Sequence, residues 1–591
     1  MAETSATPHI DNTSPPYLPH TPLSTIPTIL STAHHTSQTL RLLHPLPTRL
    51  AQLHGIERLL LENAAALTTA LSLDLGQSPM YSHLFELDGT LARLRHTIRH
   101  LKHWAKPKCE PTPFPLNLNP PARSEVRPHP RGVALIISPW NFPIQLPIGN
   151  LVDALAAGNV CILKPSEKSV HVTKLLTELL TSGKYVDERA VTVVNGGKEV
   201  AEDLLKGKVD VISYTGGAEV GRLVARAAAV NLTPVMLELG GKSPVFLTKH
   251  ADLPSAAEKI AFGKIAGNSG QLCVSPDYVL VEESIKDQFI TLLSAALDRM
   301  YPASSYTQKD ATTGRFGDVG TMISVEHAQR VVSLIENDEH APADSRCQIL
   351  YGGKHHDIPN KFVAPTVVSA TIHSKIMQHE IFGPLLAVLT VPDLPSAIDL
   401  VHTHFTCQGK HPLALYIFSN SKREQDEILN AIPSGGCAIN DVIKHPRNHH
   451  LPFGGVGTSG MGHWYGKYGF DFYSHHRGVM ISGNHSARSG SGFWGLMGKY
   501  DPGLWMTQPP YGGEEGKSKL WWFQFMAGVG SVIDGLPSWG WVKHALRRVG
   551  VTGVVLGVGY VYLFEERVWE GILDLNLRCV FRWFNELLGT T

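Results

Sequence analysis

Residues 133–167 read VALIISPWNFPIQLPIGNLVDALAAGNVCILKPSE. The first five residues are apolar without interruption, which is typical of a strand buried on both faces. Residues 146–157 follow with helix-like apolar spacing, and residues 160–163 form a second short apolar run. Strand, helix and strand in this order predict a parallel sheet with helices on both sides.

The same alternation continues on both sides of residue 238. Further strands are expected at 191–194, 209–213, 245–247, 279–281 and 414–418, and helices at 171–180, 221–230 and 256–266. A chain of 591 residues is too long for one hydrophobic core. We therefore expect an α/β fold with two domains, at residues 36–237 and 238–446.

The composition excludes some classes of protein. Lys plus Arg and Asp plus Glu both number 52, which argues against a nucleic-acid binder. Seven Cys are an odd number and form no Cys-x-x-Cys, so free thiols in a reducing compartment fit best. The 30 His form no metal-binding motif, and pairs such as His34–His35 and His449–His450 are expected in solvated loops. No secretory or mitochondrial presequence is recognisable.

The segments around these domains differ in composition. Residues 1–35 are rich in Pro, Thr, Ser and His and predict a disordered leader. Residues 107–130 contain eight prolines and predict an extended connector. Residues 483–518 are rich in Gly, Ser and Pro and predict a linker to a tail at 519–591.

Two strand ends carry residues suited to a nucleotide. Lys164 and Glu167 follow the second strand, where both can reach ribose hydroxyls. Gly216, Gly217 and Gly221 lie where another strand ends and a helix begins, so backbone amides can approach a pyrophosphate. Each motif alone is weak, because glycines at this spacing more often make a tight turn. Together they favour a dinucleotide.

The candidate reacting group is Cys273, at the end of the small-residue run GNSGQLC. A thiolate attacks carbonyls, a carboxylate such as Glu238 or Glu380 can activate water, and nearby glycines let amides approach an oxyanion. Asn141 follows the first strand and is either an oxyanion donor or a turn residue. Glu238 is either a buried base with a raised pKa or a solvated strand end.

Seven motifs carry a family resemblance. They are PWNF at 139–142, KPSE at 164–167, YTGG at 214–217, ELGGK at 238–242, GQLC at 270–273, EIFGP at 380–384 and PFGGVG at 452–457. In this order they resemble the aldehyde dehydrogenase superfamily. The stretch GMGHWYGKYGFD at 460–471 is similar to the class 3 branch, which includes membrane-bound fatty aldehyde dehydrogenases.

The resemblance implies a role for each matching residue. Cys273 would be the nucleophile, Glu238 the base that activates the deacylating water, and Asn141 with the Cys273 amide the oxyanion hole. The coenzyme, NAD or NADP, would be held by Lys164, Glu167, Gly216, Gly217, Gly221, Glu380 and Phe382. The charge of Glu167 would disfavour the 2′-phosphate of NADP.

The resemblance also implies an assembly. A Rossmann-like coenzyme domain with a bridging segment at about 113–131, a catalytic domain, and a bridging arm at 447–482 would form a homodimer. Gly217, Ala218 and Leu272 depart from the family pattern, which is expected to affect coenzyme contacts and the pocket wall.

The tail has an unusual composition. Residues 549–564 carry no charge, and eight of the eleven Trp lie after residue 490. This pattern favours a membrane anchor, with Lys543, Arg547 and Arg548 and the catalytic body on the cytosolic side. A soluble subdomain or a helix that covers a dimer is the alternative, because 16 residues are short of the roughly 20 needed for a span.

A membrane anchor would suit a lipophilic aldehyde, such as a long-chain fatty aldehyde or an apocarotenal. Two other functions remain open at this point. One is an acyl-thioester reductase, against which Glu238 argues because a reductase has no use for a water-activating carboxylate. The other is an inactive membrane scaffold, which would need none of Cys273, Asn141 and Glu238.

Overall fold

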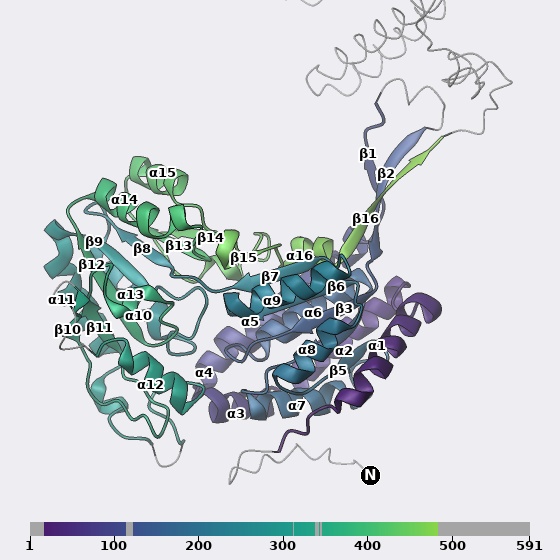
Figure 1. Cartoon of the computed structure of the whole chain (residues 1–591), viewed down its shortest axis with the longest axis horizontal. Coiled ribbons are helices and arrows are strands. Elements are labelled where there is room, and N and C mark those ends of the chain that lie inside the picture. Colours follow the sequence, from purple (N-terminus) through teal and green to yellow (C-terminus); the bar gives the residue numbers. More distant parts are fainter. Residues whose placement is uncertain (1–16, 114–121, 311–312, 337–341, 343–344, 483–591) are drawn as a thin grey trace, which may run out of the picture. The chain divides into compact units, whose positions relative to one another are not determined.

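The computed structural model describes residues 17–113, 122–310, 313–336, 342 and 345–482. The larger unit contains a six-stranded sheet in the order β15-β7-β6-β3-β4-β5 (Figure 1). Its strands are β15 Gly460–Met461, β7 Val235–Leu239, β6 Val211–Gly216, β3 Val133–Ile137, β4 Val160–Lys164 and β5 Val191–Val193. All neighbours are parallel except β15, which runs antiparallel to β7. The doubly wound sheet predicted from the apolar runs is confirmed.

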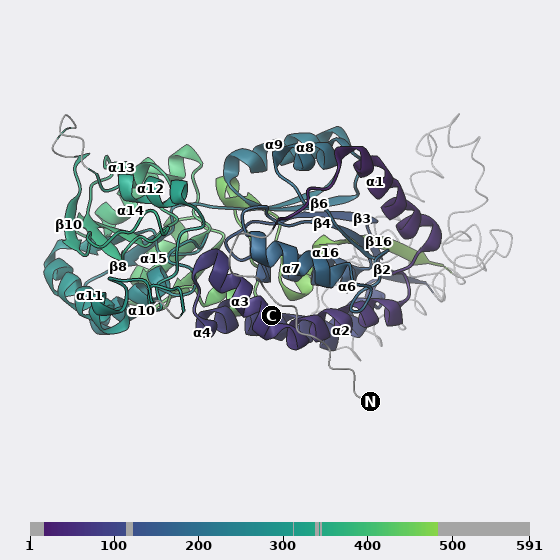
Figure 2. The ribbon, with the colours of Figure 1, turned by 90° about the horizontal axis from the view of Figure 1, so that it is seen from below.

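Helices cover both faces of this sheet (Figure 2). One face packs on α2 Leu46–Glu62, α3 Ala64–Leu75, α5 Asp88–Trp104, α6 Gln145–Ala157, α7 Val170–Leu180 and α16 Gly466–Phe472. The other face packs on α1 Ile26–His34, α8 Lys198–Lys206 and α9 Ala218–Val230. Alternate residues of β3 enter the two cores, with Ala134 and Ile136 in one and Leu135 in the other. Burial on both faces explains why the strand has no polar residue.

Helix α1 corrects the prediction for the leader. Residues 17–35 were expected to be disordered, but Ile26 is 1% exposed and packs with Ala33 in the core of the six-stranded sheet. His34, expected in a solvated loop, lies in α1, and its ring bonds to the carbonyl oxygen of Lys208 at 2.9 Å. Two buried side chains are enough to dock this segment, and the polar residues between them face outward. Residues 1–16 lie outside the described residues.

A seven-stranded sheet follows in the same unit, in the order β10-β11-β12-β9-β8-β13-β14. Its strands are β10 Gln348–Tyr351, β11 Thr366–Ser369, β12 Leu385–Val391, β9 Tyr278–Glu282, β8 Pro244–Leu247, β13 Ala414–Phe418 and β14 Gly436–Ile439. Only β10 pairs antiparallel. The second α/β sheet was predicted from its apolar runs.

Helices also cover both faces of the seven-stranded sheet. They are α10 Leu253–Ile265 and α11 Lys286–Met300 on one face, and α12 Val325–Ser333, α13 Lys375–Gln378, α14 Leu394–His404 and α15 Lys422–Ala431 on the other. Helix α10 begins where the Asp252 side chain accepts a hydrogen bond from the Ser255 amide. It ends before Gly267, whose φ of 86° turns the chain toward Cys273.

Residues 447–473, expected in the bridging arm, lie in the larger unit. Strand β15 forms the edge of the six-stranded sheet, and α16 packs on α5 and α6. The reason is that Gly460 pairs with Glu238 across the β15–β7 ladder, so this segment completes the sheet that carries Glu238.

A three-stranded sheet is formed by β1 Lys108–Glu110, β2 Arg123–Pro130 and β16 Ser474–Ile481. Of the extended connector expected at 107–130, residues 108–110 and 123–130 are paired strands, and residues 114–121 lie outside the described residues. The two prolines of β2 lie beyond Val126, where the register with β1 ends. A role of this sheet in joining two copies stays a prediction.

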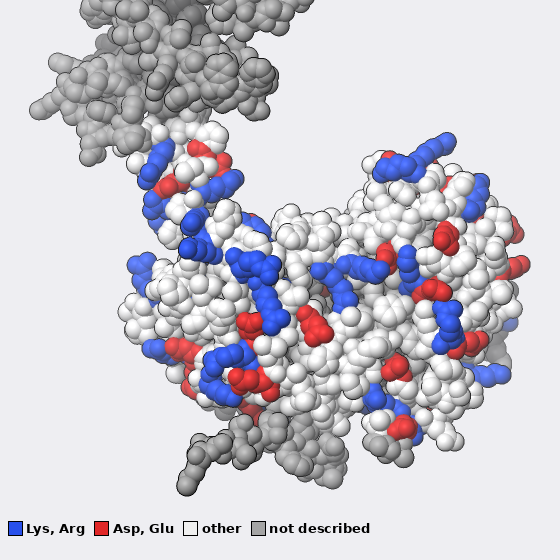
Figure 3. All heavy atoms as spheres, turned by 180° about the vertical axis from the view of Figure 1, so that it is seen from behind, with Lys and Arg blue, Asp and Glu red and all other residues white. Residues whose placement is uncertain are grey.

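The surface of the described residues carries both signs of charge, interspersed on the face in Figure 3. Among these residues, no helix has both the length and the hydropathy to cross a bilayer. Residues 483–518 and 519–591, for which a linker and a membrane-associated tail were predicted, lie outside the described part of the chain.

Candidate active site

Cys273 and Glu238 meet in the larger unit, although they come from different parts of the chain. The Cys273 thiol lies at hydrogen-bond distance from Glu238, with 3.3 Å between Sγ and Oε1. Glu238 lies within β7 and is not its last residue. Cys273 follows the turn after α10. A nucleophile and a candidate base are therefore in contact.

The turn before Cys273 is held by side-chain amides. Ser269 and Gly270 have φ values of 47° and 71°, which make the loop tight. The Asn268 side chain donates to the backbone oxygen of Asn141 at 2.7 Å, and the Asn141 side chain donates to the Gln271 carbonyl at 3.0 Å. An amide carries two N–H donors, so this bond uses one donor of Asn141. Asn141 is buried and tied to the loop that carries Cys273.

Glu238 is 2% exposed, so it is not a solvated strand end. Burial raises its pKa to about 7, and the Cys273 thiol, the charge of Arg93 and the Thr215 hydroxyl oppose this shift. A carboxyl group with this pKa exchanges protons readily near neutral pH, as a general base must.

The environment of Cys273 disfavours the thiolate form of its side chain. Burial, followed by the negative charges of Glu238 and Glu380, raises the pKa of Cys273 well above its usual value. The thiol must lose its proton to become a nucleophile, and Glu238 is in contact with it.

Glu380 and Phe382 lie beside the same centre. Burial and the charge of Asp277 raise the pKa of Glu380 to about 8. A Cβ at Gly240 would overlap the Glu380 carboxylate, so a larger residue there would displace this side chain. Phe382 packs edge-on against Trp140, with 5.5 Å between the ring centroids. Trp140 of the PWNF motif therefore contacts the EIFGP motif.

Five of the seven residues predicted to hold a coenzyme lie at or just after the ends of β4 and β6. The buried Lys164 donates from Nζ to Glu167 at 3.1 Å. Gly217 is the N-cap of α9 and has open space where a Cβ would stand. Gly216 and Gly221 are crowded instead by Tyr214 and Leu239, so their small size also serves packing. The structure brings Lys164, Glu167 and Gly217 to the carboxyl edge of one sheet.

Comparison with known proteins identifies the family. The model of the aldehyde dehydrogenase family matches residues 18–479. The chain belongs to the aldehyde dehydrogenase family. The 4,4'-diaponeurosporen-aldehyde dehydrogenase of Staphylococcus aureus is 37% identical over 434 residues, which are 73% of this chain and 89% of that protein. Aldehyde dehydrogenase family 3 member A2 of Rattus norvegicus is 37% identical over 441 residues, 74% of this chain and 85% of that one.

The fold agrees with this assignment. A structure described as the substrate-bound state of Staphylococcus aureus AldH superposes with a TM-score of 0.73 at 33% identity, covering 84% of this chain and 99% of that chain. The resemblance to aldehyde dehydrogenases, including the class 3 branch, is confirmed.

An aldehyde dehydrogenase uses NAD or NADP, and the local geometry fits such a coenzyme. The open space at Gly217 adjoins the first turn of a 13-residue helix, whose free amides favour a pyrophosphate. Lys164 and Glu167 form an ion pair, and a cation and a carboxylate are groups that can bind ribose hydroxyls.

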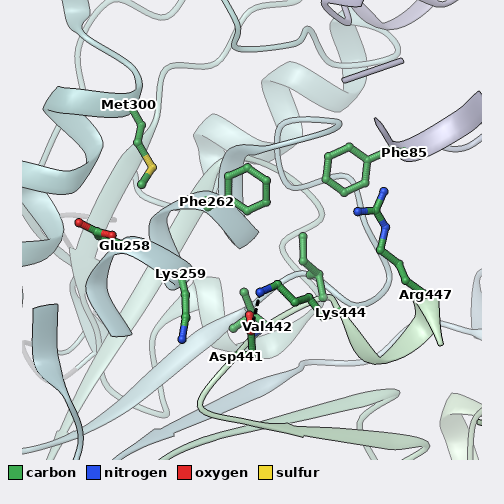
Figure 4. Close-up of a pocket in the computed structure, with 10 residues that line it drawn as sticks. Phe85, Glu258, Lys259, Phe262, Met300, Asp441, Val442, Lys444 and Arg447 are labelled. Carbon is green, nitrogen blue, oxygen red and sulfur yellow. Dashed lines mark hydrogen bonds and ion pairs between the residues drawn. The ribbon is translucent and has the colours of Figure 1, made fainter. Parts of the chain in front are cut away.

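The aldehyde dehydrogenase also has an apolar pocket of about 290 Å³ next to the turn that precedes Cys273. Phe85, Phe262 and Met300 line it together with charged residues, which include Glu258, Lys259, Arg447 and the Asp441–Lys444 ion pair (Figure 4). The Phe85 ring contacts Gly267.

A chain of hydrogen bonds links the pocket to the nucleophile. Ile443, which lines the pocket, donates its amide to the Tyr416 hydroxyl at 3.3 Å, and that hydroxyl donates to the carbonyl of Val274. The pocket is therefore close to the residue that follows Cys273.

Some neighbours of the site are not apparent from sequence motifs. The Thr215 hydroxyl lies 3.5 Å from the Glu238 carboxylate. Thr215 belongs to the YTGG motif, and this membership was the one sequence signal that could have placed it near the site. Lys264 is 2% exposed, and its Nζ has no hydrogen-bond partner among the described residues. Arg93 lies far along the sequence from every motif, and no local pattern indicates that it is near the site.

Proposed function

We propose that this protein oxidises lipophilic aldehydes to carboxylic acids with NAD or NADP, through a thioester on Cys273. The observation that carries the proposal is the 3.3 Å contact between the Cys273 thiol and a buried Glu238. The Asn141 amide, anchored two residues before the nucleophile, is the matching oxyanion donor.

The residues act in sequence. Cys273 loses its thiol proton to solvent, and its sulfur adds to the aldehyde carbon. The oxyanion is stabilised by the Asn141 side chain and the Cys273 amide, and one such donor is typically worth about 3 kcal/mol. The coenzyme, when bound, accepts the hydride from the adduct, which leaves an acyl group on the sulfur.

Hydrolysis completes the cycle. Glu238 takes a proton from water, the hydroxide oxygen adds to the thioester carbon, and the C–S bond breaks to release the carboxylic acid. The need for a water-activating base favours this direction over an acyl-thioester reductase, and the intact site favours an enzyme over a scaffold.

A lipophilic substrate is supported by the apolar pocket around Phe262 and Met300. The name of the staphylococcal relative, which refers to a diaponeurosporen aldehyde, points to the same chemical class. Fatty and apocarotenoid-type aldehydes both fit this description.

Narrowing the pocket is expected to penalise long aldehydes selectively. We expect the wild-type kcat/KM to be higher for hexadecanal than for propanal, because burying each methylene contributes about 0.8 kcal/mol. Met300→Trp fills the pocket and is expected to lower kcat/KM for hexadecanal roughly tenfold while sparing propanal. The rate of NADH release gives kcat/KM for each of the two aldehydes.

Leu429→Trp is the matched control, because Leu429 is 39% exposed and lies outside the pocket. Equal loss on both aldehydes in Met300→Trp, or no preference for hexadecanal in the wild type, contradicts a lipophilic chain in this pocket.

We further propose that residues 519–591 attach the enzyme to a membrane with its catalytic body in the cytosol, and that two copies form a homodimer. The support for the anchor is the uncharged run at 549–564, with basic residues before it and Trp around it.

Removing residues 484–591 is expected to move the enzyme from the membrane pellet to the soluble fraction with its activity on propanal retained. Cell fractionation followed by an NADH assay measures this. Continued pelleting of the active, truncated enzyme after a carbonate wash contradicts the anchor.

A further inference from the structure

A buried ion pair lies beside the candidate active site and belongs to none of its motifs. Arg93 of α5 is 2% exposed and donates from Nη2 to Asp153 of α6, which is 1% exposed. Burying a charged pair costs desolvation free energy that the pair alone seldom recovers, so a conformational or functional role is a reasonable expectation.

Two glycines make room for the pair. A Cβ at Gly149 of α6 would overlap the Arg93 guanidinium, and a Cβ at Gly469 of α16 would overlap the Asp153 carboxylate. Helix interiors usually disfavour glycine by about 1 kcal/mol. The local sequence of two helices therefore accommodates this pair.

Aromatic rings enclose the guanidinium. Its central carbon lies 4.3 Å from the ring centroid of Trp464 and 4.4 Å from that of Tyr465. Both rings are buried, and Nε and Nη1 of Arg93 have no hydrogen-bond partner among the described residues. Cation–π attraction is then a main force that fixes the two rings.

The same rings lead to Glu238. The charge of Arg93 and the nearby Trp464 indole lower the pKa of Glu238 against the effect of burial. The indole nitrogen is buried and makes no hydrogen bond within the described residues, so it acts on the carboxylate at longer range than the Cys273 thiol does. Gly460, four residues before Trp464, pairs with Glu238 itself.

We propose that Arg93 is a positioning residue for thioester hydrolysis: by stacking on Trp464 and Tyr465 it fixes the segment that follows β15, the strand that pairs with Glu238. This inference rests on the proposed role of Glu238 as the base.

The groups around Glu238 decide in which direction its pKa changes when Arg93 is replaced. The Cys273 thiol and the Thr215 hydroxyl donate to the carboxylate, and both lower its pKa. Burial, and with it the charge of Glu238, raises the pKa of the Tyr465 phenol, so that phenol stays neutral. Arg93 is thus the cation that acts on Glu238, and its loss should raise the pKa of this base.

The first test replaces both charges, with Arg93→Met and Asp153→Asn in one chain, so that neither partner remains alone. The pH midpoint of steady-state NADH release is expected to move up by roughly one unit. From a midpoint of about 7, the rate at pH 7 then falls about 5-fold and recovers at alkaline pH, while the pre-steady-state NADH burst is retained.

Three further variants sharpen the test. Arg93→Lys keeps the charge, so its pH midpoint should lie close to that of the wild type. Trp464→Phe keeps the ring and removes the indole donor, and it should shift the midpoint in the same direction by less. Arg95→Gln is the control, because Arg95 is on the same helix, 51% exposed and paired with Glu57. Its midpoint should match the wild type.

The outcomes separate this inference from the proposed function. Normal turnover in Glu238→Gln overturns the base and this inference with it. A stalled Glu238→Gln together with an unmoved midpoint in the Arg93 double variant overturns only the role of Arg93. If the double variant does not fold, as judged by circular dichroism, the midpoint of Trp464→Phe decides, and no shift there refutes the proposal.

Discussion

Replacement of Cys273 by alanine is expected to abolish aldehyde oxidation while coenzyme binding persists. The side chain removed is the thiol in contact with Glu238. Losing the nucleophile of a covalent mechanism commonly lowers kcat by roughly 10⁶-fold. Stopped-flow NADH absorbance should show neither burst nor turnover, and titration with NAD should give a Kd close to that of the wild type.

Cys437→Ala is the matched control for this experiment. Cys437 lies in β14, and burial raises its pKa to about 12, so it remains an inert thiol. The variant should turn over normally. Appreciable oxidation by Cys273→Ala, with Cys437→Ala unchanged, would refute the assignment of the nucleophile.

Glu238→Gln is expected to form the thioester and then stall. The amide cannot take a proton from water, so the first turnover releases NADH and the steady-state rate falls by roughly 10²–10⁴-fold. In the wild type, burial raises the pKa of Glu238 to about 7, and the ionised form is the active one. The steady-state rate should therefore fall as the pH drops through about 7, with the burst less affected.

Glu202→Gln provides the comparison, since Glu202 is 55% exposed and pairs only with Lys198 on the surface. A steady-state rate of Glu238→Gln equal to that of Glu202→Gln would remove Glu238 from the role of base. Loss of both burst and turnover would place Glu238 in the activation of the thiol instead, because the carboxylate also contacts Cys273.

Strands buried on both faces were predictable because their physical requirement is local. Val133–Ile137 and Ala414–Phe418 must be apolar at every position, and a continuous apolar run is visible in the sequence. The contact of Cys273 with Glu238 was also anticipated, although through family motifs and not through spacing. The separation of 35 residues between them carries no geometric information by itself.

Other features depend on partners far along the chain. Helix α1 was missed because only Ile26 and Ala33 of its residues are fully buried, and a leader rich in Pro and Thr hides them. The buried pair of Arg93 and Asp153 joins two helices 60 residues apart, and each residue alone resembles an ordinary surface charge. Composition and periodicity do not reveal such contacts, because the partner defines them.

The position of β15 has a consequence for how the enzyme is made. During translation, Asn141, Glu238 and Cys273 leave the ribosome well before Gly460, which supplies the edge strand next to Glu238. The nascent chain can form most of both sheets and still lack the wall that Trp464 and Tyr465 provide. The active site is thus completed late in synthesis. Until residues 460–465 have been made, the wall beside Glu238 and the Cys273 thiol is incomplete.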